Sequence, residues 1–208
     1  MTPLSRRAFT AGALASLLVG CGGPDADRAA NEDRDGGTPP PAPPADKATG
    51  DGKALGRSVP VGLQIPAIEV DTPVMRLGLA SDGTMQVPPI TADDRAGWYR
   101  HSPTPGQVGP SVIVGHVTVG THGDGVFRHL ARLRRGDRIT ARLENGTAAV
   151  FAVSAVQKIA KADFPADDVY GDVDRPELRL ITCGGRLTGD GYVDNVIVFA
   201  SMTSASSD

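Results

Sequence analysis

Leu178-Arg179-Leu180-Ile181-Thr182-Cys183-Gly184-Gly185 is an apolar run that ends on a cysteine and two glycines. Leucine, isoleucine and threonine, with no helix breaker before the cysteine, are typical of a short buried β-strand. The paired glycines allow the backbone to turn sharply or another chain to approach closely. We therefore expect a strand that presents the Cys183 thiol at its carboxyl end, where a substrate can reach it.

A second run, Ser111-Val112-Ile113-Val114-Gly115-His116, has the same design and places an imidazole at the end of a strand. A buried cysteine is more often an inert small hydrophobe than a nucleophile. Two features favour the nucleophile here, because Cys183 has no disulfide partner within the predicted folded domain and a histidine ends the second run. A cysteine with a histidine far away in sequence is the pattern of a thiol acyl-transfer enzyme.

Short motifs follow one another in a fixed order from about Pro60 to about Met202. They include Leu63–Pro66, Asp82–Met85, Gly97–Tyr99, Gly115–Val117, Val126–Leu130, Gly136–Ile139, Thr182–Gly185 and Asp194–Val196. Together they resemble the sortases, the cysteine transpeptidases that attach proteins to the bacterial cell wall. The Cys-Gly-Gly and Tyr-x-Asp-Asn-Val details are most similar to the class F and class E branches of high-GC Gram-positive bacteria.

The residues themselves predict an all-β fold, since many short strands with Gly and Pro turns argue for a barrel or a sandwich. The expected strands are 61–66, 70–76, 111–116, 138–143, 148–155, 177–183 and 195–200, with a hairpin turn at 144–147. Only Val126–Arg134 has apolar residues at helical spacing, with Asp124 as its N-cap. The resemblance narrows this to a sortase-type β-barrel of seven or eight strands with one or two short helices.

The resemblance also implies a mechanism. Cys183 would attack the carbonyl of an LPxTG-like sorting motif and form a thioacyl-enzyme, and His116 would act as general acid and base for the departing and incoming amines. The acceptor would be a cell-wall peptidoglycan precursor or another amine. No cofactor is implied.

Sortases carry an arginine on the strand after the cysteine, and here the pattern breaks. In the form Tyr-Arg-Asp-Asn-Val that arginine falls on Val193, which donates nothing. Arg186 is the nearest substitute to stabilise the oxyanion, whereas Arg179 is expected to serve mainly stability. The defect leaves a second hypothesis open, a non-catalytic or weakly hydrolytic wall-binding lipoprotein with a degenerate barrel.

Substrate recognition is expected in the segment 159–173, before the cysteine strand. Ala162, Phe164 and Val169 either form an apolar wall for the sorting peptide or pack as a satellite core. Thr182, which adjoins the nucleophile, is also expected to bind the substrate. Five aspartates between positions 163 and 174 make this region acidic, but no spacing matches a defined calcium loop, so no metal site is predicted.

The N-terminus predicts export. Residues 1–21 resemble a signal peptide with a lipobox that ends on Cys21, the lipidated residue, although an uncleaved membrane anchor remains an alternative. Lipidation would remove the only other cysteine. The Pro-rich segment 22–57 cannot bury a core and is expected to be a disordered linker to the catalytic domain, 58–203. The domain is therefore expected outside the cytoplasm, held at the membrane by the N-terminal lipid and facing the cell wall.

The formal net charge of −3 gives no indication of nucleic-acid binding. The order of the two reactive residues disfavours other cysteine enzymes of the cell wall. An L,D-transpeptidase has its histidine a few residues from its cysteine, and a papain-like peptidase has its cysteine well before its histidine, whereas His116 precedes Cys183 by a long interval.

Overall fold

The computed structural model describes residues 53–90, 95–189 and 191–207. The predicted signal peptide with Cys21, and the predicted linker as far as residue 52, lie outside the described residues. Within the described part of the chain, no helix is long and apolar enough to cross a membrane.

Eight strands and a few short helices make up the described fold. The strands are β1 (Pro60–Ile65), β2 (Val70–Leu77), β3 (Ala96–Tyr99), β4 (Gly109–Val114), β5 (Arg138–Leu143), β6 (Thr147–Ala160), β7 (Pro176–Thr188) and β8 (Gly191–Ser207). The α-helix α1 spans Ala166–Tyr170, and four 3-10 helices span Pro66–Ile68, Gly120–His122, Leu130–Arg132 and Lys161–Asp163.

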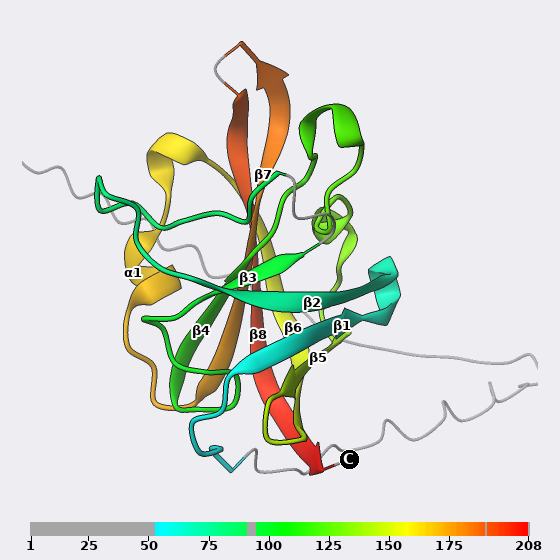
Figure 1. The fold of residues 1–208 in the computed structure, drawn as a ribbon, viewed down its shortest axis with the longest axis vertical. Coiled ribbons are helices and arrows are strands. Elements are labelled where there is room, and N and C mark those ends of the chain that lie inside the picture. Colours follow the sequence, from blue (N-terminus) through cyan, green and yellow to red (C-terminus); the bar gives the residue numbers. More distant parts are fainter. Residues whose placement is uncertain (1–52, 91–94, 190, 208) are drawn as a thin grey trace, which may run out of the picture. The chain divides into compact units, whose positions relative to one another are not determined.

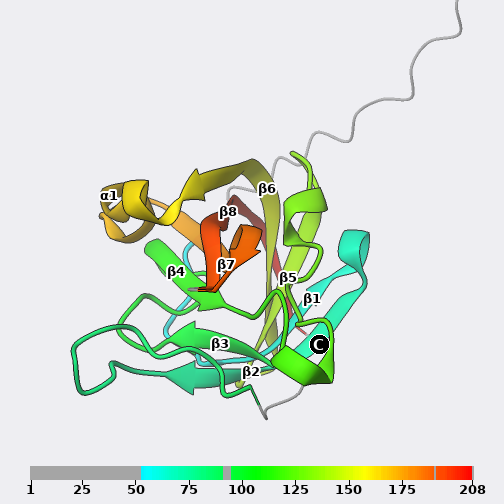
Figure 2. The same ribbon diagram turned by 90° about the horizontal axis from the view of Figure 1, so that it is seen from above.

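The strands close into a barrel in the order β1-β2-β3-β4-β7-β8-β6-β5, which can be followed in Figures 1 and 2. Neighbouring strands are antiparallel except β2 with β3 and β4 with β7, which are parallel. The predicted β-barrel of seven or eight strands is therefore confirmed, with eight strands.

Alternation along β7 separates the barrel core from the functional face. Leu178 and Leu180 are fully buried in the main core cluster, together with Trp98, Phe127 and Phe151. The residues between them point the other way, since side chains of a strand alternate between its two faces. Ile181 accordingly packs in a second cluster outside the barrel, formed by Leu77, Val112, Val114, Val169, Ile181 and Ile197.

The predicted helix at Val126–Arg134 is wrong. Its apolar residues Phe127, Leu130 and Leu133 are buried as expected, but only Leu130–Arg132 forms a single 3-10 turn. The amide of Phe127 is used elsewhere, because it donates to the carbonyl of His116 at 2.9 Å. Asp124 caps no helix and instead forms an ion pair with Arg128 at 3.0 Å.

Candidate active site

The parallel pairing of β4 with β7 brings the two predicted reactive residues together. Val114 lies opposite Ile181, and the amide of Gly115 donates to the carbonyl of Ile181 at 3.1 Å, one residue beyond the end of β4. His116 and Cys183 each lie two residues beyond this matched pair, and both line the same cavity. Because both strands run in the same direction, the imidazole and the thiol emerge at the same edge of the sheet.

Thr182 fixes this junction from inside. Its hydroxyl is buried and donates to the carbonyl of Gly115 at 2.8 Å, which ties the middle of β7 to the residue before His116. Gly115 is required at this point because a Cβ there would lie 2.7 Å from side-chain atoms of both Val126 and Phe127. The backbone that carries His116 is thus held on one side by a hydrogen bond and on the other by packing.

The cavity at this edge has a volume of about 320 Å³. Val114, Gly115, His116, Ile181, Thr182 and Cys183 form its floor, and Met85, Val87, Pro88, Phe164, Tyr170 and Asn195 complete its lining. Most of these side chains are apolar, so the cavity suits the apolar part of a peptide, with few polar groups to fix its orientation. Cys183 is partly exposed and is the free cysteine of the described residues.

A loop between β2 and β3 contributes a contact to the imidazole that the sequence did not predict. The carbonyl of Pro88 lies 2.6 Å from Nε2 of His116. Since a carbonyl oxygen can only accept, Nε2 is the donor in this contact and carries a proton. The loop therefore fixes both the tautomer and the orientation of the ring in this structure.

The segment before β7 supplies the opposite wall, although not with all the residues expected. Phe164 lines the cavity, Val169 is fully buried in the outer cluster, and Ala162 is exposed and does not line the cavity. Val169 thus packs as a satellite core, whereas Phe164 lies at the cavity, and its contact with a sorting peptide stays a prediction. Tyr170 was not predicted. Its ring lies 6.1 Å from that of Phe164, and burial, with a smaller effect of Tyr99, raises the pKa of its phenol.

The position of Arg186 depends on a β-bulge. The register of β7 with β8 pairs Cys183 with Asn195, Gly184 with Asp194 and then Leu187 with Tyr192, so that two residues of β7 face the single residue Val193. Gly185 occupies the first of these positions with a φ of 76°, which favours glycine, and a Cβ there would collide with the carboxylate of Asp194.

The bulge changes which side chains share a face. In a regular strand residue 185 would share the face of Cys183 and residue 186 would lie on the opposite face. Because the bulge adds one residue, Arg186 lies on the face of Cys183 instead. Leu187 pairs with Tyr192 and so shares the face of Asp194, opposite to that of Cys183 and Asn195. Arg186 is exposed and lies across from Val193, the position at which the sequence lacks the expected arginine.

Two further polar side chains, those of His101 and Arg179, do not line the cavity that holds the thiol. His101 lines a neighbouring hollow of about 350 Å³ that shares Tyr170 with the main cavity. Arg179 is buried on the outer face of β7, where its guanidinium forms an ion pair with Glu177. In the described part of the chain, no three His, Cys, Asp or Glu side chains are grouped so as to hold a metal ion.

A closed eight-stranded barrel that presents a thiol and an imidazole from adjacent parallel strands defines a class of protein, the cysteine transpeptidases with a sortase fold. The family model described as "Sortase domain" matches residues 63–203. The chain belongs to the sortase family and is a cysteine transpeptidase.

Solved structures agree with this assignment. The SrtA sortase from Actinomyces oris is 25% identical, with a TM-score of 0.53 over 74% of this chain and 84% of that one. Sortase A from Corynebacterium diphtheriae, in a lid mutant, is 20% identical, with a TM-score of 0.53 over 71% and 72% of the two chains. The sortase D5 transpeptidase from Clostridium perfringens is 20% identical, with a TM-score of 0.52 over 70% and 78%. No curated protein sequence matches the chain significantly.

Proposed function

We propose that this sortase cleaves an LPxTG-like sorting motif of secreted proteins and transfers the acyl group to an amine of the cell wall. The observation that carries the proposal is the parallel register of β4 and β7, which opens His116 and Cys183 into one apolar cavity. Such a cavity suits a short peptide whose carbonyl group is presented to the thiol.

Cys183 is the nucleophile in this proposal. Its sulfur attacks the peptide carbonyl carbon, the C–N bond breaks, and a proton from His116 passes to the departing amine, which leaves a thioester on Cys183. The nitrogen of the acceptor amine then attacks the thioester, gives its proton to His116 and releases the Cys183 sulfur. The Nε2 proton directed at Pro88 implies that the loop from Met85 to Pro88 shifts, or that Nδ1 serves the reaction.

Arg186 is proposed to supply the oxyanion donor. The bulge at Gly185 supports this role, because it places Arg186 on the face of Cys183 and across from Val193. Arg186 is exposed and does not line the cavity in this structure, so the proposed role requires its side chain to turn toward Cys183 when substrate binds. Thr182, by contrast, is proposed to support the site through the backbone, since its hydroxyl is already engaged with Gly115.

The finer assignments rest on the sequence. Cys-Gly-Gly and Tyr-x-Asp-Asn-Val support a class F or class E enzyme of Gram-positive type. The lipobox at Cys21 supports a lipoprotein held at the outer face of the membrane. The competing function, a wall-binding lipoprotein with little catalysis, is favoured by one observation, the valine at position 193.

Thiol labelling and cleavage of a panel of LPxTG-like peptides test the proposal. Cys183→Ala is expected to stay folded and to lose both peptide cleavage and the thioacyl adduct, and His116→Ala should be nearly as damaging at every pH, since both half-reactions need proton transfer. Cleavage that survives in Cys183→Ala would refute the assignment of the nucleophile.

A separate experiment tests Arg186 as the oxyanion donor. Arg186→Ala should lower kcat/KM roughly tenfold or more, since loss of one oxyanion donor costs roughly 10²–10³ in rate. If Arg186→Ala is silent and Val193→Arg raises activity, the oxyanion site is incomplete and the wall-binding function gains.

A further inference from the structure

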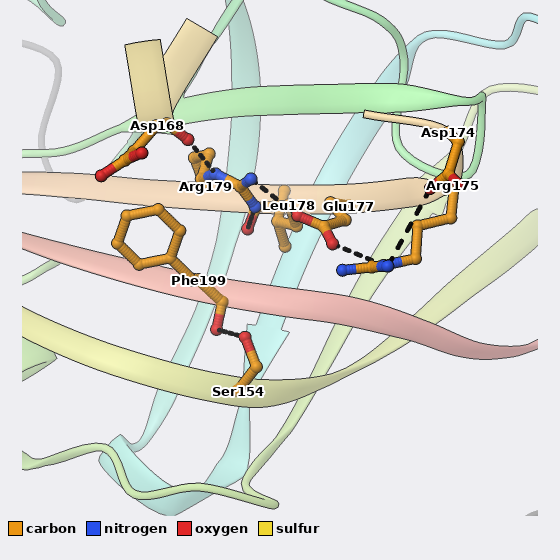
Figure 3. A network of polar contacts seen from close by, with 8 residues as sticks. All are labelled: Ser154, Asp168, Asp174, Arg175, Glu177, Leu178, Arg179 and Phe199. Atoms are coloured by element: carbon orange, nitrogen blue, oxygen red, sulfur yellow. Dashed lines mark hydrogen bonds and ion pairs between the residues drawn. The ribbon is translucent and has the colours of Figure 1, made fainter. Parts of the chain in front are cut away.

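Arg179, on the outside of the barrel, is almost completely buried, and its guanidinium contacts several neighbouring groups. Arg179 lies on the outer face of β7, and only 3% of its surface is exposed. Its Nη2 forms an ion pair with Glu177 Oε2 at 2.6 Å, its Nη1 donates to the carbonyl of Leu178 at 3.4 Å, and its guanidinium lies 4.7 Å from the ring centre of Phe199. Figure 3 shows these contacts.

Glu177 is shared between two arginines. Its other oxygen, Oε1, accepts from Nε of Arg175 at 2.7 Å, and its side chain is 8% exposed, against 65% for that of Arg175. Of the two ion pairs, the one between Glu177 and Arg179 is therefore buried, and the one between Glu177 and Arg175 lies at the surface. A buried ion pair contributes little net stability, but removal of one partner leaves an uncompensated charge, so its main effect is to fix geometry.

The third nitrogen of the Arg179 guanidinium, Nε, contacts the helix α1. Nε donates to the carbonyl of Asp168 at 3.2 Å, within α1. The last carbonyls of a helix have no partner inside it, and α1 is only five residues long, so this external donor replaces a bond that the helix cannot make for itself. The planar guanidinium can hold Glu177 and Asp168 at once because its donors point in fixed directions.

The two residues after Asp168 connect it to the outer cluster and to the active-site cavity. Val169 packs against the outer cluster that contains Ile181, and Tyr170 lines the cavity that contains Cys183 and contacts Phe164. The height of α1 over β7 therefore sets the distance between this aromatic wall and the thiol. The barrel core does not depend on Arg179, since Leu178 and Leu180 fill it from the opposite face of the strand.

We propose that Arg179 is a positioning residue for substrate binding, which holds α1 so that Phe164 and Tyr170 form the wall opposite Cys183. This inference rests on the proposed function, because the wall is taken to hold the peptide substrate. Arg179 does not act on the thiol, and its loss is expected to alter how the substrate is held and to leave the reactivity of Cys183 unchanged.

The test compares the full chain with its Arg179→Lys variant. Lysine keeps the positive charge beside Glu177 but lacks the second, fixed donor for Asp168. We expect KM for the sorting peptide to rise roughly tenfold, as expected for one charge-assisted hydrogen bond, with a much smaller change in kcat. The rate of Cys183 alkylation by iodoacetamide should stay the same, and the amides of 164–171 should exchange faster with solvent while those of β4 do not.

Arg142→Lys is the matched control. Arg142 forms an ion pair with Asp71 at the same distance, 2.6 Å, but both side chains are exposed and lie on β5 and β2, away from α1. This variant should change neither KM nor exchange in 164–171. Glu177→Gln provides a second test if Arg179→Lys is poorly folded, because it removes the charge that holds Arg179 and keeps the shape of the side chain.

Unchanged exchange in 164–171 and unchanged KM in Arg179→Lys would overturn the proposal. So would slower alkylation of Cys183 or faster exchange throughout the barrel, since either would give Arg179 a general structural role. If the wild-type chain cleaves no sorting peptide, the proposed function fails, and the exchange comparison still decides whether Arg179 positions α1.

Discussion

Thr182→Val removes one hydroxyl and nearly preserves the shape of the side chain. Thr182 is 4% exposed, and its hydroxyl is the donor that ties the carbonyl of Gly115 to β7. A buried acceptor left without its donor costs about 1–3 kcal/mol. For a domain of this size each kcal/mol lowers Tm by about 2–4 °C, so the expected fall is about 2–12 °C.

The effect on activity should be larger than the effect on stability. Without the tie, the backbone that carries His116 is free to move away from Cys183, and a displacement of about 1 Å is enough to lower the rate by about 10². Peptide cleavage and thermal unfolding, measured on the same preparation, compare the two effects at a temperature where the variant is fully folded.

Thr203→Val is the matched control for this experiment. The hydroxyl of Thr203 donates to the carbonyl of Val150 at 3.2 Å, which joins β8 to β6 in a part of the barrel that does not line the cavity. It should lower Tm and leave kcat/KM of the folded protein unchanged. Full activity in Thr182→Val, or an equal loss of activity in Thr203→Val, would refute the argument that the hydroxyl aligns the site.

Three further outcomes follow from other parts of the structure. Gly185→Ala should lower kcat/KM with little loss of secondary structure, because a side chain there meets Asp194 and displaces the bulge that orients Arg186; circular dichroism beside the peptide assay separates the two effects. The raised pKa of Tyr170 favours the neutral phenol in the folded protein. Its contribution to the free energy of unfolding should therefore be fully present below about pH 10 and be lost as the pH rises through the raised pKa. In denaturant titrations at alkaline pH, Tyr170→Phe should lose less stability than the wild type. Cys21→Ala should abolish lipid labelling without affecting peptide cleavage, and mass spectrometry of the mature N-terminus would contradict the lipobox if Met1 is intact.

The strands with continuous apolar runs could be predicted from the sequence, because β4 and β7 are buried on both faces and show this directly. The short strand β3 (Ala96–Tyr99) was not predicted, since four residues with a glycine among them carry no periodicity. The predicted helix at Val126–Arg134 failed for the opposite reason. Its apolar spacing is helical, but tertiary contacts of Phe127 with the backbone of His116 override the local preference.

The functional site, like the fold, could be predicted from the sequence only in part. Cys183 and His116 could be singled out because each follows an apolar run of the sequence, although β7 continues past Cys183 to Thr188 instead of ending there. The loop that reaches His116 through Pro88, and the aromatic wall at Tyr170, depend on contacts between distant segments that leave no local pattern in the sequence. The role open to Arg186 likewise depends on the bulge in β7, which changes the face of every residue after Gly184.

The pairing of β4 with β7 has a consequence for the folding of the chain. Thr182 and Gly115 are 67 residues apart, and closing a loop of that length costs on the order of 4 kcal/mol in chain entropy. No local hairpin can therefore assemble the thiol and the imidazole, and the pair exists only after β7 has docked beside β4. Recovery of peptide cleavage during refolding should accordingly report late, long-range strand pairing, because a partly folded chain carries a thiol that lacks its imidazole partner.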